Sequence, residues 1–200
     1  MPIKNLEPKK NILTGKLVFL RPPALADFRE YTVLMNKSMR SSRWLGNPHK
    51  GKKKFAKYVQ PSKKGQYYRF LTCRNEDRRI VGSIGLFLIE RNFLQSGVTG
   101  YMVGAPYVRR GYATEALQLI LRFAFRTLKL HRIEASIQPD NVASKALVKR
   151  AGFKLEGYSP RFIKLRGRWR DHERWAILVE DWRKKTKGRL RPRNSAAKSS

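Results

Sequence analysis

The alternation of apolar and polar positions along this chain predicts a mixture of strands and helices, the α/β (α+β) class. The strongest helical pattern covers residues 113–128, where apolar side chains recur at i, i+3, i+4 and i+7. A shorter helix is expected from Asp140 or Asn141, either of which is a good N-cap, to the residues before Gly152. Further helices are expected at about 24–39 and 52–59, and strands at 16–21, 67–73, 80–89, 97–103, 132–137, 153–156 and 174–179. Strands and helices therefore alternate in the second half of the chain.

The length of 200 residues favours one domain with short extensions. Residues 1–12 are polar and read as a flexible lead-in, and residues 13–182 carry all of the patterned segments. Residues 183–200 contain eight basic residues and no acidic one, which predicts a disordered basic tail. We find no run of about 18 apolar residues and no apolar leader, so we expect no transmembrane helix and a cytoplasmic protein.

Cysteine and histidine are scarce. The single cysteine, Cys73, has no internal partner for a disulfide and lies in an apolar stretch, so we interpret it as a buried thiol and not as a nucleophile. Of the three histidines, His131 and His172 are interpreted as structural, and His49 is left unassigned.

The charge is unusual, because 45 basic residues face 14 acidic ones for a net charge of +31. The basic residues cluster at 50–57, 161–170 and 183–200. Such an excess indicates contact with a polyanion, most often a nucleic acid such as RNA. The alternative is a general basic bias with no partner behind it.

The segment 103–114 joins a predicted strand to the long helix. Gly111 and Ala113 are small where a backbone must approach a ligand, and Arg109 and Arg110 add positive charge beside the first turn of the helix. Free N–H groups and the positive end of the helix dipole make this a candidate cradle for a pyrophosphate. The alternative is a basic surface loop.

Several motifs together resemble one family. The segment 100–116 resembles motif A of the GNAT N-acetyltransferases in its RimJ/RimL-type form, which includes ribosomal-protein alanine N-acetyltransferases. Other segments agree with that family in order and spacing: 17–22, 131–135, 139–144, 150–158 and 167–172. The resemblance covers roughly residues 13–182. It implies a mixed, mostly antiparallel sheet with a central splay flanked by helices, acetyl-CoA as co-substrate, and no metal.

The same resemblance implies roles for individual residues. Backbone groups of Met102 and Val103 would hold the pantetheine and the thioester, Asn141 would contact the cofactor, and Ser144 would lie near the leaving sulfur. The pyrophosphate would lie on the amides of Val108, Arg109, Arg110, Gly111, Tyr112, Ala113 and Thr114. For Asn141 and Ser144, ordinary helix capping is the alternative.

The chain departs from the family pattern at positions that matter for catalysis. Val108 stands where glutamine or arginine is usual, and Arg109 replaces a common glycine. Val98 and Ile163 stand where some members place an acidic residue. Neither familiar catalytic carboxylate is therefore expected.

One other carboxylate is a candidate acid/base. Strand alternation places Glu134, Ser136 and Gln138 on one face, so Glu134 would serve if that face looks into the splay. The alternative is a structural ion pair of Glu134 with Arg132 or with a basic residue of a helix.

These observations predict acetyl transfer from acetyl-CoA to an amine by direct attack in a ternary complex. The amine is expected to be the N-terminal α-amine of a ribosomal or other protein, because an α-amine with a pKa of about 8 is far easier to deprotonate than a lysine at about 10.4. Two alternatives stay open: an RNA- or ribosome-associated module with weak or no catalysis, and a small-molecule amine acetyltransferase, which the shortage of acids disfavours. We expect no membrane partner, and a monomer or a dimer.

Overall fold

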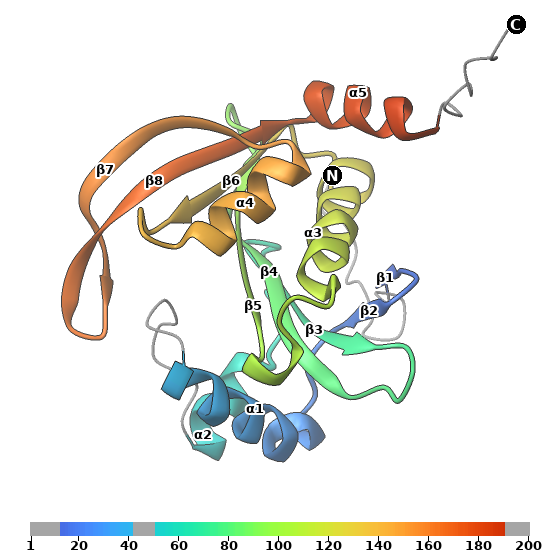
Figure 1. Cartoon of the computed structure of the whole chain (residues 1–200), viewed down its shortest axis with the longest axis vertical. Coiled ribbons are helices and arrows are strands. Elements are labelled where there is room, and N and C mark those ends of the chain that lie inside the picture. The colour runs from blue at the N-terminus through green and yellow to red at the C-terminus, as the bar shows by residue number, and fades with distance from the viewer. Residues whose placement is uncertain (1–12, 42–50, 191–200) are drawn as a thin grey trace, which may run out of the picture.

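The computed structural model describes residues 13–41 and 51–190 (Figure 1). Within these residues, eight strands form one sheet in the order β1-β2-β3-β4-β5-β6-β8-β7. The strands are β1 Leu13–Thr14, β2 Val18–Arg21, β3 Tyr68–Arg74, β4 Ile80–Glu90, β5 Ser96–Val103, β6 Arg132–Ile137, β7 Lys154–Leu165 and β8 Arg168–Leu178. The helices are α1 Phe28–Ser41, α2 Lys52–Tyr58, α3 Tyr112–Arg122, α4 Val142–Ala151 and α5 Val179–Leu190. The expected mixed, mostly antiparallel sheet flanked by helices is confirmed.

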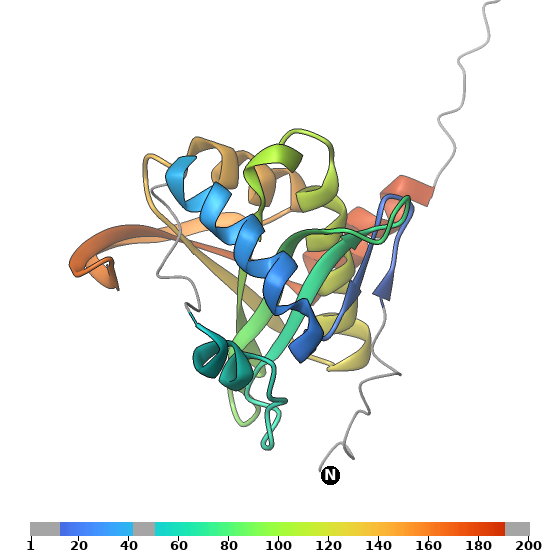
Figure 2. The same cartoon turned by 90° about the horizontal axis from the view of Figure 1, so that it is seen from below.

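Helices cover both faces of the sheet (Figure 2). Successive side chains of a strand point to opposite faces, so the sheet has a hydrophobic core on each face. In β2, Val18 and Leu20 pack into the first core under α3, whereas Phe19 packs with α1 and α2 in the second core on the other face. Cys73 of β3 lies in the second core and is fully buried, as expected. Burial raises the pKa of its thiol to about 11, so it stays protonated at neutral pH.

The long amphipathic helix predicted at 113–128 forms as α3 and continues as a π-helical segment, Phe123–Thr127. Its apolar face is buried, with Leu117 and Ile120 fully inaccessible to solvent. On its polar side, the Glu115 carboxylate accepts the backbone N–H groups of three consecutive residues, 16–18, at 2.7–2.8 Å. This contact ties the first turn of α3 to the edge of the sheet.

The sheet opens between β5 and β6, the two parallel neighbours. Their pairing covers only Ser96–Val98 against Arg132–Glu134. Beyond Val98, β5 has no strand partner on its β6 side among the described residues. The result is the central splay that the sequence predicted.

The β7–β8 hairpin is longer than predicted and extends away from the body of the sheet (Figure 1). The sequence pattern indicated only short strands at 153–156 and 174–179. The strands continue because Arg166 and Gly167, with φ of 50° and 83°, form a two-residue turn in the left-handed region. Such turns match the twist of a two-stranded ribbon.

The C-terminal boundary also differs from the prediction. The disordered tail was expected to begin at residue 183, but α5 extends to Leu190. Trp182 anchors the helix, since it is 7% exposed and its ring lies 5.3 Å from that of Phe125. Lysine and arginine are good helix formers, so a basic composition does not end a helix that tertiary packing has started. Residues 1–12, 191–200 and His49 lie outside the described residues.

None of the described helices is both long and apolar enough to cross a membrane.

Candidate active site

A cleft of about 760 Å³ occupies the splay between β5 and β6. One end is closed by the loop before α3, one side by α4, and another by the β7–β8 hairpin. The lining residues include Met102, Val103, Val108, Arg109, Arg110, Gly111, Tyr112, Ala113, Thr114, Asn141 and Ser144. Every residue predicted to contact the cofactor therefore lies in one cavity.

The loop before α3 has the backbone geometry of an anion cradle. Gly111 is the N-cap of α3 with φ of 83°, and a Cβ built on it would lie 3.2 Å from the Leu17 side chain. Arg109 also has a left-handed φ of 62°, although it carries a side chain. The position where the family commonly places glycine thus keeps the glycine-like conformation. The first-turn N–H groups of α3 and the two arginines make the loop fit a diphosphate.

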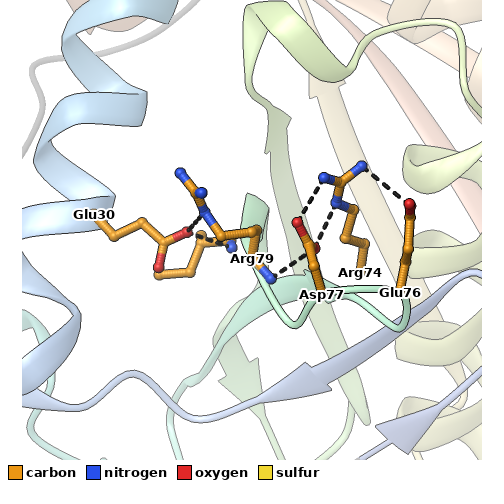
Figure 3. Close-up of polar contacts among 6 residues, drawn as sticks. Glu30, Arg74, Glu76, Asp77 and Arg79 are labelled. Atoms are coloured by element: carbon orange, nitrogen blue, oxygen red, sulfur yellow. Dashed lines mark hydrogen bonds and ion pairs between the residues drawn. The ribbon is translucent and has the colours of Figure 1, made fainter.

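An ion-pair cluster lies on the turn between β3 and β4 (Figure 3). Arg74 donates to both oxygens of Asp77 at 2.6 Å and to Glu76 at 3.3 Å, and these bonds raise its pKa. The held guanidinium lies 5.6 Å from the ring centre of Tyr107, which lines the cleft. Arg79 of the same turn is bound by Glu30 of α1.

Asn141 and Ser144 begin α4 at the cleft wall. The Asn141 side-chain oxygen accepts the Ser144 N–H at 3.2 Å, so the capping role is present. Both residues also line the cleft, so capping and substrate contact are compatible. Opposite them on β5, the hydroxyl of Tyr101 lies 3.5 Å from the Ser144 carbonyl oxygen. Burial raises the pKa of Tyr101 to about 12.

Glu134 is not brought into the cleft with the others. Its carboxylate binds Arg132 at 2.9 Å and Arg174 at 2.6 Å, and Arg132 also binds Glu156. Burial raises the pKa of Glu134, but the bonds from both arginines outweigh it and hold the pKa below its ordinary value. A carboxylate held ionised by two guanidiniums is a poor proton acceptor, which favours the ion-pair interpretation.

The described lining of the cleft contains no aspartate or glutamate. Ile163 of β7 does line it, so the hairpin position that the resemblance assigns to a glutamate presents an apolar side chain. Val98 lies at the last paired position of β5, opposite Glu134. Among the described residues, no cluster of acidic, histidine or cysteine side chains is suited to hold a metal.

The structure brings into the cleft a residue that the sequence analysis set aside. His172 of β8 is 3% exposed and lines the cleft. The sequence signal was the Asp-His pair at the end of the hairpin motif, but strand alternation alone did not show which way the ring faces. His131, by contrast, is half exposed and pairs with Glu180, as expected of a structural residue.

A sheet that opens between two parallel strands, with a glycine-capped helix N-terminus at one end of the opening, defines the class of acyl-CoA-dependent N-acyltransferases. The chain belongs to the GNAT family, because the acetyltransferase (GNAT) domain model matches residues 18–154. Acetyltransferases of this fold use acetyl-CoA.

Individual proteins extend this assignment. The chain is 33% identical to the probable N-acetyltransferase YjcK of Bacillus subtilis over 178 residues, which cover 85% of this chain and 98% of that protein. It is 32% identical to the [ribosomal protein uS5]-alanine N-acetyltransferase of Escherichia coli over 120 residues, 60% of this chain and 62% of that enzyme. Among solved structures, Mycobacterium smegmatis RimJ in complex with CoA-disulfide superposes with a TM-score of 0.75 at 26% identity, covering 84% of this chain and 85% of that one.

Proposed function

We propose that this enzyme acetylates the N-terminal α-amine of a protein, by direct attack of that amine on acetyl-CoA in a ternary complex. The observation that carries the proposal is the cleft lining, which presents arginines, apolar groups and neutral polar groups but no carboxylate among its described residues. Such a surface suits an acceptor with one isolated amine.

The electrostatics of the cleft disfavour two other acceptor classes. Polyamines and aminoglycosides carry several positive charges, and Arg109, Arg110 and Arg150 in the lining would repel them. A lysine amine is neutral in only about one molecule in a thousand at neutral pH, whereas an α-amine is neutral in about one in ten. A site without a carboxylate base therefore favours α-amines.

The residues of the cleft take the following roles in this proposal. The amides of residues 108–114 hold the diphosphate, and the backbone of Met102 and Val103 orients the thioester. Asn141 contacts the bound cofactor, and Ser144 stands near the sulfur. The bound acetyl-CoA supplies the activated acetyl group.

A related enzyme and the positive charge of this chain favour a protein acceptor that is bound to the ribosome. The E. coli relative acts on alanine of ribosomal protein uS5, as its name states. The hairpin beside the cleft carries five basic residues and no acidic one over 161–170. A polyanion bound there would bring its own proteins to the cleft and offset the repulsion between a +31 enzyme and a basic substrate.

A peptide panel tests the proposal directly. It contains free N-termini, blocked N-termini with an internal lysine, spermidine, and a control without acceptor. Turnover is expected with free N-termini alone. Turnover with the blocked lysine peptide or with spermidine, and not with free N-termini, would overturn the proposal. Intact masses of ribosomal proteins from a deletion strain then test the ribosomal version, which predicts a loss of 42 Da (about one acetyl group) from at least one protein.

A second candidate is an RNA-bound module that keeps acetyl-CoA as a structural ligand. The exposed basic hairpin and the absence of a carboxylate from the described cleft lining favour it. Tight CoA binding with no turnover of any acceptor, peptide or ribosome, is the result expected of that module.

A further inference from the structure

One titratable side chain of the cleft, the imidazole of His172, belongs neither to the loop before α3 nor to the start of α4. His172 lines the cleft on β8 and is 3% exposed. It lies two residues from Arg174, and so on the same face of the strand. Arg174 is paired in register with Ser136 of β6, which also lines the cleft.

That face of the sheet is the one away from α3 and α4. Ile133, Ala135 and Ile137 of β6 project from the opposite face into the core beneath these helices. The diphosphate cradle belongs to the N-terminus of α3, so an incoming amine approaches from the other face, where the hairpin forms a wall. His172 therefore lies on the acceptor side.

The hydrogen bonding of His172 fixes its tautomer. Its Nδ1 lies 2.9 Å from the carbonyl oxygen of Arg170. A carbonyl oxygen only accepts, so Nδ1 carries the hydrogen, and in the neutral ring Nε2 keeps its lone pair. Nε2 has no hydrogen-bond partner within residues 13–41 and 51–190.

The surroundings keep this ring neutral near pH 7. Burial lowers the pKa of His172, and Arg174 lowers it further, whereas the bond to Arg170 and the charge of Asp171 oppose the shift. The Phe162 ring of β7 packs against it at 6.1 Å.

The other groups of the described cleft lining cannot take a proton at neutral pH. The charged ones are Arg109, Arg110 and Arg150, whose guanidiniums carry donors only and no acceptor. Tyr101, with a pKa of about 12, is protonated already.

We propose that His172 is the general base of the acetyl transfer. Its Nε2 takes one proton from the incoming ammonium group, and the freed amine attacks the thioester carbonyl carbon. The C–N bond forms as the C–S bond breaks, the sulfur receives the second proton of the nitrogen, and the imidazolium returns its proton to solvent. The inference rests on the acetyl transfer of the family and, for an α-amine, on the proposed function.

The test compares His172→Asn with His131→Asn. Asparagine keeps a donor near the Arg170 carbonyl but offers no basic nitrogen. We expect the kcat of H172N at pH 7 to fall by up to about tenfold, because about one α-amine in ten is neutral without a base, with CoA affinity within about twofold of wild type and the kcat of H131N unchanged. The pH profile separates catalysis from structure: the loss should shrink as the pH approaches about 8, where the amine deprotonates unaided. An equal loss at every pH, or none, would overturn the proposal.

A second measurement does not depend on the folding of a variant. Imidazole ¹⁵N spectra of the wild-type protein should show His172 with Nδ1–H, an unprotonated Nε2 at pH 7, and a pKa below its ordinary value of about 6.5. A proton on Nε2 at pH 7 would refute the assignment. Both experiments use whichever amine the acceptor panel turns over. Rejection of α-amines by the wild type would therefore contradict the proposed function alone, and an unchanged H172N would contradict only the role of His172.

Discussion

Two residues of the loop before α3 have a left-handed backbone conformation, and this conformation is strained in the one that carries a side chain. Arg109 holds φ of 62° with a side chain attached, whereas Gly111 holds φ of 83° without one. A non-glycine residue in this region costs about 1–2 kcal/mol. The arginine at this position therefore lowers stability and places a cation beside the proposed diphosphate site.

Replacing Arg109 by glycine separates these two effects. We expect the free energy of unfolding to stay constant or rise by up to about 1 kcal/mol, because relief of strain is partly offset by the entropy of glycine. The dissociation constant for CoA should rise by about three- to tenfold through loss of one charge. Thermal unfolding and calorimetric titration check both, with Arg109→Ala as the control that loses the charge and keeps the strain. A less stable R109G protein would contradict the interpretation.

Gly111, unlike Arg109, lies where a side chain would be both strained and crowded. A valine there would be forced into a left-handed φ, and its Cβ would meet Leu17 at 3.2 Å. We expect Gly111→Val to weaken CoA binding by at least about tenfold, since the cradle amides would be displaced. RNA binding by the hairpin should be unchanged, because Gly111 lies in the loop before α3 and not in the hairpin. Binding of CoA to G111V with wild-type affinity would remove the loop from the proposed site.

Sequence reasoning at the residue scale succeeded where a local rule applies. An asparagine before an apolar run caps α4, and a glycine after it ends the helix, because both depend on neighbours in the chain. The sequence alone led us to interpret His172 as structural, and it left two roles open for Glu134, an acid/base in catalysis or a structural ion pair. The environment of Glu134 depends on Arg174, 40 positions away in the sequence, and that of His172 on the other elements around the cleft. Strand alternation predicts the face on which a side chain lies but not what packs against that face.

At the scale of elements, a charge network ties three strands together beside the cleft. Glu134 of β6 binds Arg132 of the same strand and Arg174 of β8. Arg132 in turn binds Glu156 of β7. The network holds the hairpin against the sheet and hence the wall of the cleft. Its role is positional.

The substitution Glu134→Gln tests this role. We expect a loss of about 1–3 kcal/mol in the free energy of unfolding near pH 7, with kcat within about threefold of wild type. The folded pKa of Glu134 is depressed, so its contribution is fully present above the unfolded pKa of about 4.3 and is lost as pH falls through the folded value. The stability difference should therefore vanish only below about pH 4, as followed by urea unfolding across pH. A kcat loss of 100-fold with full stability would instead assign Glu134 to catalysis.

The hairpin is the element that sequence patterning underestimated, and its chemistry supports a second prediction. Lys164 and Arg168 are both exposed. Replacing both by glutamine should weaken binding to a 20-nucleotide single-stranded RNA and reduce the slope of log K against log salt by about 1.4, at about 0.7 per lost phosphate contact. Arg183→Gln with Lys184→Gln on α5 makes the same charge change elsewhere on the molecule and serves as the control. Equal effects of the two double variants would indicate a nonspecific charge effect.

At the scale of the whole molecule, the net charge of +31 makes salt an informative variable. A free basic peptide is repelled by the enzyme, so added salt should screen the repulsion and lower its KM. A substrate presented on RNA is attracted through the polyanion, so added salt should raise its KM. The Debye length falls from about 10 Å at 0.1 M to about 3 Å at 1 M salt, so both trends should be evident across that range.

Because salt should change KM in opposite directions for the free and the RNA-presented substrate, the measurement distinguishes the two ways of binding. The same ribosomal protein would be assayed free and within the ribosomal subunit between 0.05 and 0.5 M KCl, roughly the range over which several phosphate contacts cost 10³-fold or more in affinity. A neutral peptide with a free N-terminus is the control, and its KM should hardly change. If the KM for the free protein also rises with salt, attraction to the acceptor itself governs binding. The basic surface then has a different purpose from that of bringing the enzyme to an RNA-bound substrate.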